Sequence, residues 1–190
     1  MTRLLAFTAL AAAASLTLVA CTGTDTGTSP QESAATTAEA EHGDHHMDHP
    51  ADGGPAPAGI VEAADPTYPA GTEVILEADH MPGMKGAPAT ISGAFDTTAY
   101  SVSYTPTDGG APVSDHRWVV HEELVDPGEA PLPDGSTVTL DADHMSGMKG
   151  AEATIDYSTR DTVYMVDIDT PDMTMTNHKW VTESEIRPAE

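Results

Sequence analysis

An internal repeat constrains the fold of this chain more than any other feature of its sequence. The stretch from Gly71 to Ala87 aligns without a gap with the stretch from Gly135 to Ala151. Two shorter matches follow: Thr98-x-Tyr-x-Val against Thr162-x-Tyr-x-Val, and His116-Arg-Trp-Val against His178-Lys-Trp-Val. Similarity at a fixed spacing is typical of repeated structural units. We therefore predict two tandem β repeats, at residues 67–126 and 131–190, joined by a short Pro- and Gly-containing linker.

Comparing the two copies separates inward from outward positions. Val74 and Leu76 recur as Val and Leu in the second copy, whereas Ile75 between them becomes Thr. Such alternation predicts half-buried antiparallel strands, and the Gly, Pro and Asp clusters between them predict hairpins. The sequence thus predicts an all-β fold of two small SH3-like β-barrels, with a small open β-roll as the alternative. We expect Trp118 and Trp180 in the core or at the interface between domains.

The N-terminus predicts export and lipid anchoring. Arg3 precedes an uncharged apolar run at residues 4–18, which is typical of a signal peptide at residues 1–20. The run ends in Leu18-Val-Ala-Cys21, which resembles the lipobox of bacterial lipoproteins, so Cys21 is the predicted lipidation site. An ordinary secretory signal that happens to contain a Cys is the alternative. The expected location is extracytoplasmic, attached to the bacterial cell membrane through the lipid on Cys21.

Residues 21–66 are predicted to form a disordered tether after the lipidated Cys. This segment is rich in Ala, Thr, Gly, Pro, Ser and acidic residues and has little to bury. The whole chain has a formal net charge of −24, which argues against binding nucleic acid. Within the tether lies a dense tract of possible metal ligands, although a His-rich linker without a metal role is the alternative: His42, His45, His46, Met47 and His49.

The loop from Asp79 to Gly86 recurs from Asp143 to Gly150 with one change, Pro82 to Ser146. Its glycines suit a turn with positive φ. A His and two Met within five residues are ligands suited to Cu(I), and nearby Asp or His favours Cu(II). A strand His precedes each Trp by two residues, and we expect it to approach the loop of its own copy. The predicted metal ligands, for copper rather than zinc or nickel, are His80, Met81, Met84, His116, His144, Met145, Met148 and His178.

A structural role for these loop residues is the alternative interpretation. The loop His would then bind a backbone carbonyl to hold the turn, and the two Met would pack in the core. No cofactor is required by the sequence. Motifs for a hydrolase elbow, a phosphate loop, a Cys nucleophile or a zinc-protease helix do not occur, so we predict that the protein is not an enzyme.

The repeat resembles the YdhK-like lipoproteins, whose domain of unknown function occurs in tandem. The resemblance depends on Asp-His-Met-x-Gly-Met-Lys-Gly-Ala, Thr-x-Tyr-x-Val and His-Arg/Lys-Trp-Val, and it runs from about Thr67 to the C-terminus. The family implies a surface-anchored protein and no defined activity. Two functions are consistent with the sequence: an envelope lipoprotein that binds copper as a buffer, scavenger or chaperone, or a non-catalytic module that binds cell-wall polymer or a partner protein.

Overall fold

The structure is a computed structural model that describes residues 49–189. The predicted signal peptide, the lipidation site Cys21 and the tether ligands His42, His45, His46 and Met47 lie outside these residues. The described part contains no helix long and apolar enough to span a membrane. Its elements are β1 (Val61–Glu62), β2 (Glu73–Leu76), β3 (Pro88–Tyr104), β4 (Val113–Val120), η1 (His121–Glu123), β5 (Thr137–Thr139), β6 (Glu152–Asp169), β7 (Thr174–Thr182), η2 (Glu183–Glu185) and β8 (Ile186–Pro188). The all-β prediction is confirmed.

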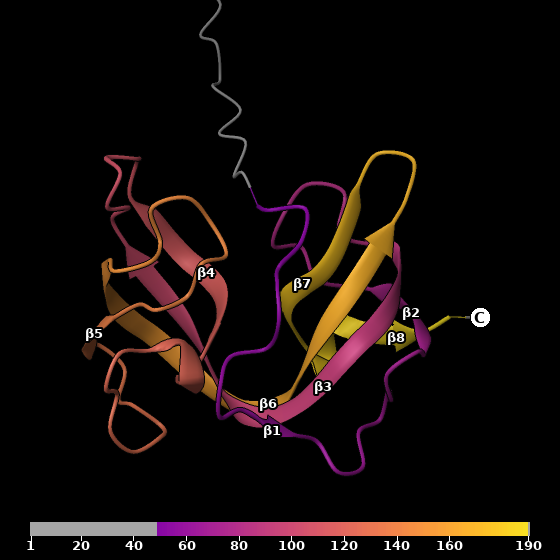
Figure 1. Ribbon diagram of the computed structural model, residues 1–190, viewed down its shortest axis with the longest axis horizontal. Helices are drawn as coiled ribbons and strands as arrows, with labels where there is room; N and C mark the ends of the chain where they lie inside the picture. Colours follow the sequence, from indigo (N-terminus) through magenta and orange to yellow (C-terminus); the bar gives the residue numbers. More distant parts are fainter. Residues whose placement is uncertain (1–48, 190) are drawn as a thin grey trace, which may run out of the picture. The chain divides into compact units, whose positions relative to one another are not determined.

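Two long strands, one from each copy, dominate the sheet. β3 has 17 residues and β6 has 18, and they pair antiparallel from Ala89 opposite Ile168 to Tyr104 opposite Ala153. At about 3.3 Å per residue such a strand is roughly 55 Å long, which exceeds the width of one small core. Figure 1 shows the two strands side by side, with the shorter strands added at their ends. The strand order is β5-β6-β3-β2-β8, with β4 on β3 and β7 on β6.

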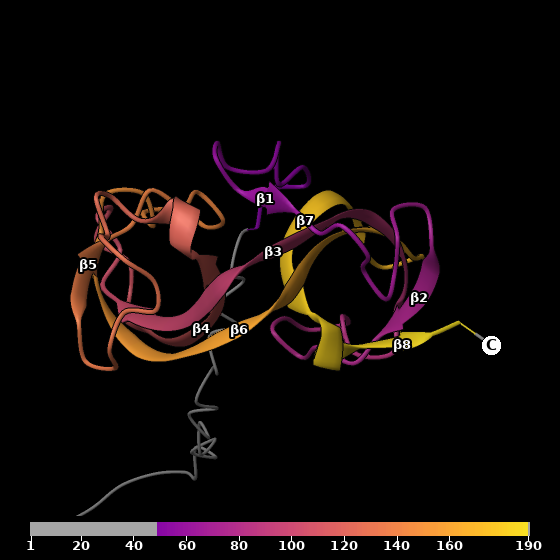
Figure 2. The same ribbon diagram turned by 90° about the horizontal axis from the view of Figure 1, so that it is seen from below.

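Each end of this strand pair carries its own core, and each core mixes the two copies (Figure 2). Lobe A, which includes β2, β7 and β8, packs Val74, Leu76 and Ile91 from the first copy against Tyr164 and Val166 from the second. Lobe B, which includes β4 and β5, has the reverse composition: the second half of the first copy packs on the first half of the second. The copies have therefore exchanged halves.

The expectation that each copy closes on itself as a separate small barrel is wrong in this respect. A separate small barrel would require the chain to fold back within residues 88–104, but it continues as one strand through residues 92–97. Because the strand does not fold back there, its second half reaches the other lobe. The last strand of the second copy accordingly pairs with the first strand of the first copy, Leu76 opposite Ile186.

A third cluster lies between the two lobes and contains both tryptophans. Trp118 and Trp180 are 6% and 0% exposed, and they pack with Phe95, Val120 and Val163. The rings of Phe95 and Trp180 make a T-shaped contact at a centroid distance of 5.7 Å. The prediction that the tryptophans lie in a core or interface is confirmed.

Candidate functional site

The repeated loops form tight turns that insert a methionine into each core. Gly83 and Gly86 have φ of 83°, so the backbone takes a conformation that side chains with a Cβ disfavour. Met84 and Met148 are completely buried, one in lobe A and the other in lobe B. Their thioethers fill space in the cores, which is the structural alternative set out above. They are not available as metal ligands without unpacking a lobe.

In lobe B the loop histidine binds a buried carboxylate. His144 Nε2 donates to Glu123 Oε1 at 2.8 Å, and the indole Nε1 of Trp180 donates to Glu123 Oε2 at 2.9 Å. The backbone N–H of Val120 also donates to Oε2, at 3.2 Å. Burial acts to raise the pKa of Glu123, but the charge and hydrogen bond of His144 outweigh it and lower the pKa. Trp180 belongs to β7, so this carboxylate joins the two lobes.

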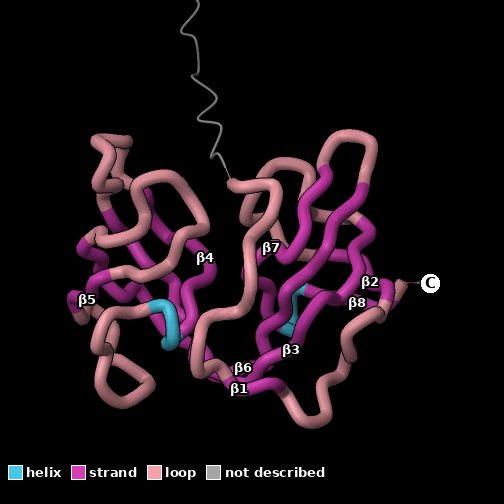
Figure 3. Tube along the Cα trace, viewed as in Figure 1, coloured by secondary structure: helices cyan, strands magenta, loops and turns pink. Residues whose placement is uncertain are grey.

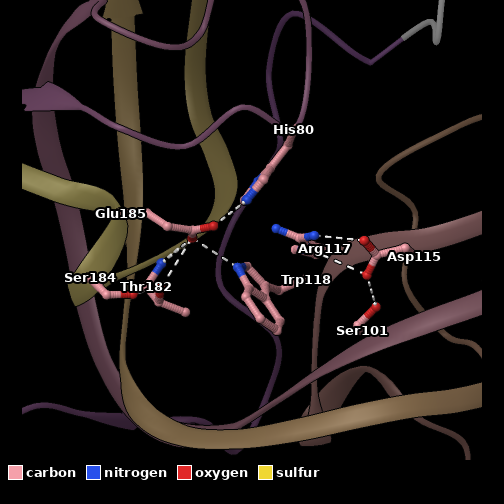
Figure 4. Close-up of polar contacts among 8 residues, drawn as sticks. All are labelled: His80, Ser101, Asp115, Arg117, Trp118, Thr182, Ser184 and Glu185. Carbon is pink, nitrogen blue, oxygen red and sulfur yellow. Dashed lines mark hydrogen bonds and ion pairs between the residues drawn. The ribbon is translucent and has the colours of Figure 1, made fainter.

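The same arrangement recurs in lobe A with the copies interchanged, as Figure 4 shows. His80 Nε2 donates to Glu185 Oε1 at 2.6 Å, and Trp118 Nε1 donates to Glu185 Oε2 at 2.9 Å. Thr182 donates to the same carboxylate through its backbone N–H at 2.9 Å. Burial opposes ionisation here too, yet the hydrogen bond from His80 lowers the pKa of Glu185. Both glutamates occupy the same position in their copies, five residues after the tryptophan, and neither was among the predicted site residues.

A cleft of about 180 Å³ opens between β4 and β7, and histidines line it. Its walls include His49, His80, His116 and His178, and a smaller adjoining hollow also reaches His144. All five described histidines named as possible ligands therefore gather in one region. The rim carries Asp115, which accepts hydrogen bonds from Arg117 at 2.6 Å and Ser101 at 2.7 Å (Figure 4).

Burial keeps three of these imidazoles neutral. It lowers the pKa of His116 to about 3, with His144 contributing repulsion, and lowers the pKa of His178 to about 3, with His49 contributing. The pKa of His49 falls to about 4 for the same reason. A neutral imidazole offers a lone pair on one ring nitrogen, which is the form that binds metals.

The structure brings His116 and His144 together, although they belong to different copies. Their ring centroids are 6.0 Å apart. His116 Nε2 and His144 Nδ1 are buried and have no hydrogen-bond partner. Met145 lies in the same cluster, because its sulfur accepts a hydrogen bond of 3.7 Å from Tyr104, whose ring is 6.1 Å from that of His116. The expectation that each strand His approaches the loop of its own copy is therefore wrong for this pair, since the halves are exchanged.

The remaining predicted ligands are placed differently. Met81 is partly buried against the core of lobe A, and His80 Nδ1 is buried without a partner. Within residues 49–189, no three His, Cys, Asp or Glu side chains are arranged to hold a metal ion together. The geometry thus offers pairs of imidazoles rather than a complete tetrahedral set.

Comparison with known proteins agrees with the repeat. The family model described as "Protein of unknown function (DUF1541)" matches residues 70–121 and 134–183. The chain is 48% identical over 159 residues to the uncharacterized protein YdhK of Bacillus subtilis, covering 79% of this chain and 77% of that protein. The crystal structure of that DUF1541 family protein has a TM-score of 0.69 at 50% identity and covers 72% of this chain and 94% of its own. The solution structure of the YdhK C-terminal domain has a TM-score of 0.59 at 54% identity, over 63% of this chain and 92% of that one.

Proposed function

The chain belongs to the DUF1541 family, and from this premise we propose that it binds a metal ion, copper first, through the histidines of the interlobe cleft. The family resemblance found in the sequence is confirmed, while the family description assigns no activity. The observation that carries the proposal is the pair His116 and His144, with two buried ring nitrogens that have no partner. Buried polar atoms are usually hydrogen-bonded, so two neighbouring buried nitrogens without a hydrogen-bond partner require an explanation.

The spacing of the pair suits a shared metal ion. Two imidazoles that bind the same metal ion through nitrogens at about 2 Å have ring centroids roughly 6 Å apart. The ring centroids of His116 and His144 are 6.0 Å apart. Metal-bound histidines usually donate their other ring N–H to a carboxylate or a carbonyl, and His144 donates to Glu123 in this way. A carboxylate only accepts, so Nε2 of His144 carries the proton of this hydrogen bond, and Nδ1 is the nitrogen that would bind a metal ion in the deprotonated form.

The number of ligands favours Cu(I) among the candidate ions. Zinc sites are almost always four-coordinate, whereas the described residues offer no group of three ligands of the usual kinds. Cu(I) is a soft ion that accepts two imidazoles and also binds thioethers, and Met145 is the adjacent thioether. The proposal also includes attachment of the protein to the cell membrane through the lipid on Cys21. The protein would then be an envelope-anchored copper buffer, scavenger or chaperone that performs no catalysis.

A competitive Cu(I) titration against a chromophoric chelator tests this function. The mature chain would carry Cys21→Ser together with Ala at His42, His45, His46 and Met47, so that only the folded part competes for copper. We expect His116→Ala plus His144→Ala to remove the tightly bound Cu(I) equivalent that this pair holds. His121→Ala is the matched control, because His121 lies outside the cleft and bonds Tyr100 and Gly128. The same number of tightly bound Cu(I) equivalents in the double variant and in the control would contradict the proposal.

A non-catalytic interaction module is the second candidate function. The observation that favours it is the complete burial of Met84 and Met148, which gives the repeated loop a packing role independent of metal. The carboxylate partners of His80 and His144 likewise stabilise the loop by themselves. Absence of Cu(I) binding in the titration above would leave this module, with cell-wall polymer or a protein as partner, as the better explanation.

A further inference from the structure

A short segment outside both repeats is docked on β7. Residues 49–54, here called the docked segment, precede the first family match at residue 70. Thr176 donates its backbone N–H to Ala51 O at 2.8 Å, and Gly53 donates to Thr176 O at 2.9 Å. The side chain of Asn177 donates to Asp52 Oδ1 at 3.1 Å. Figure 3 shows this loop segment running beside β7.

The contact between the docked segment and β7 is close enough to require glycine. A Cβ placed on Gly53 would lie 2.1 Å from the carbonyl oxygen of Asn177, a distance at which the backbone must move. The side chain of Ala51, two residues earlier, is exposed. The docking is therefore sterically specific. A side chain at Gly53 disturbs it while both imidazoles stay in the chain, although the same Cβ would also lie 3.5 Å from the Cα of His178.

Docking brings His49 to the histidine cleft. Its ring centroid lies 5.6 Å from that of His178, with an edge-on angle of 61°. His49 lines the main cleft beside His178, and it also lines the smaller hollow that reaches His144. The tract predicted as possible metal ligands within a disordered tether therefore has its last histidine at the cleft of the folded part.

The two lobes differ in what faces the strand histidine. In lobe B the strand residue His116 has the loop residue His144 as its neighbour, at 6.0 Å. In lobe A the loop residue His80 lies against Trp118, at 6.4 Å, and His49 stands beside His178 instead. The neighbouring imidazole of the strand histidine therefore comes from the docked segment in lobe A and from the loop in lobe B.

We propose that His49 and His178 form a second two-imidazole site for a monovalent soft cation, Cu(I), which the repeats alone do not complete. This inference extends the proposed copper function and depends on it. The centroid distance of 5.6 Å is near the roughly 6 Å that two imidazoles around one metal require. The angle between the rings does not prevent binding, because a two-coordinate ion leaves each ring free to turn about its metal–nitrogen bond. Binding here is simple coordination and changes no oxidation state.

The test counts Cu(I) equivalents in the same mature chain used above, with Cys21→Ser and the four outer tether ligands replaced by Ala. We expect two tight equivalents in this parent protein. His49→Ala should lose one of them and His116→Ala the other. Gly53→Val should lose the same equivalent as His49→Ala, because it keeps the ligand but displaces the segment. Ala51→Val is the matched control and should keep both equivalents.

Imidazole NMR signals report which site is lost and whether each variant is folded. Addition of Cu(I) should shift the His178 ring signals in the parent and not in His49→Ala, while the His116 signals shift in both. Loss of one equivalent in His116→Ala with none lost in His49→Ala and Gly53→Val would overturn this inference and leave the proposed function intact. Failure of the parent protein to bind Cu(I) at all would overturn both.

Discussion

The hydrogen bonds that the Glu123 carboxylate accepts predict a large loss of stability when this side chain is truncated. The Glu123 side chain is 5% exposed and accepts from His144, Trp180 and Val120. Glu123→Ala leaves these three donors buried without an acceptor, and each such donor costs about 1–3 kcal/mol. Because the donors can relax together, we expect a decrease of roughly 3–6 kcal/mol in the free energy of unfolding. Urea denaturation followed by tryptophan fluorescence would show a midpoint lower by roughly 2 M.

Two comparisons make this prediction specific to the buried bonds. Glu185→Ala should cost less, about 1–3 kcal/mol, because the side chain of Glu185 is 15% exposed and water can replace part of the lost bonding. Glu152→Ala, at an exposed position of β6, should change stability by at most about 0.5 kcal/mol. If Glu123→Ala lowers the free energy of unfolding no more than Glu152→Ala does, the carboxylate does not hold the lobes together and the prediction is wrong.

Three further predictions follow from the same structure. Proteolytic cleavage of a site engineered into the linker at 126–131 should leave the two fragments as one peak in size-exclusion chromatography, since β3 and β6 stay paired; separated fragments would refute the exchange of halves. In metal-free protein, His116 and His178 stay neutral when folded and take up protons at their ordinary pKa of 6.5 when unfolded, so stability falls as the pH drops below 6.5. The loss at pH 5 should reach about 2 kcal/mol per histidine, measured by urea denaturation, and a flat profile would contradict it. Met84→Ala and Met148→Ala should each cost about 2–5 kcal/mol through the cavity left in a core, while the Cu(I) affinity of the folded variants stays unchanged.

The sequence predicted the class of the fold and the faces of its strands. Alternation at Val74 and Leu76, preserved between the copies, indicated inward positions, and both residues are buried in lobe A. The alternation of apolar and polar residues along a strand indicates which side chains face the core, and this alternation can be read directly from one sequence. The repeated His and Met also singled out the loop whose histidines lie at the cleft. Its methionines at 84 and 148 could not be distinguished from ligands, because a thioether serves equally well in a core.

The carboxylate partners and the histidine cleft needed the tertiary structure. His144 bonds Glu123 across 21 residues, and His80 bonds Glu185 across 105, so no local spacing marks these pairs. Glu123 and Glu185 occupy the same position in the two copies, but nothing in the sequence indicated that Glu123 would be buried and Glu185 largely covered. His49 was predicted as a tether ligand, and only the docking of its segment on β7 brings it beside His178.

The sequence by itself determined that this chain is a repeated all-β protein with a defined set of inward residues. Only the tertiary structure decided which half of each copy packs against which. The physical reason is that the copies are similar: the first half of one copy complements the second half of either. The choice depends on whether residues 92–97 turn back or continue as strand, and they continue. That single continuity places His116 beside the loop of the other copy and so creates the candidate site.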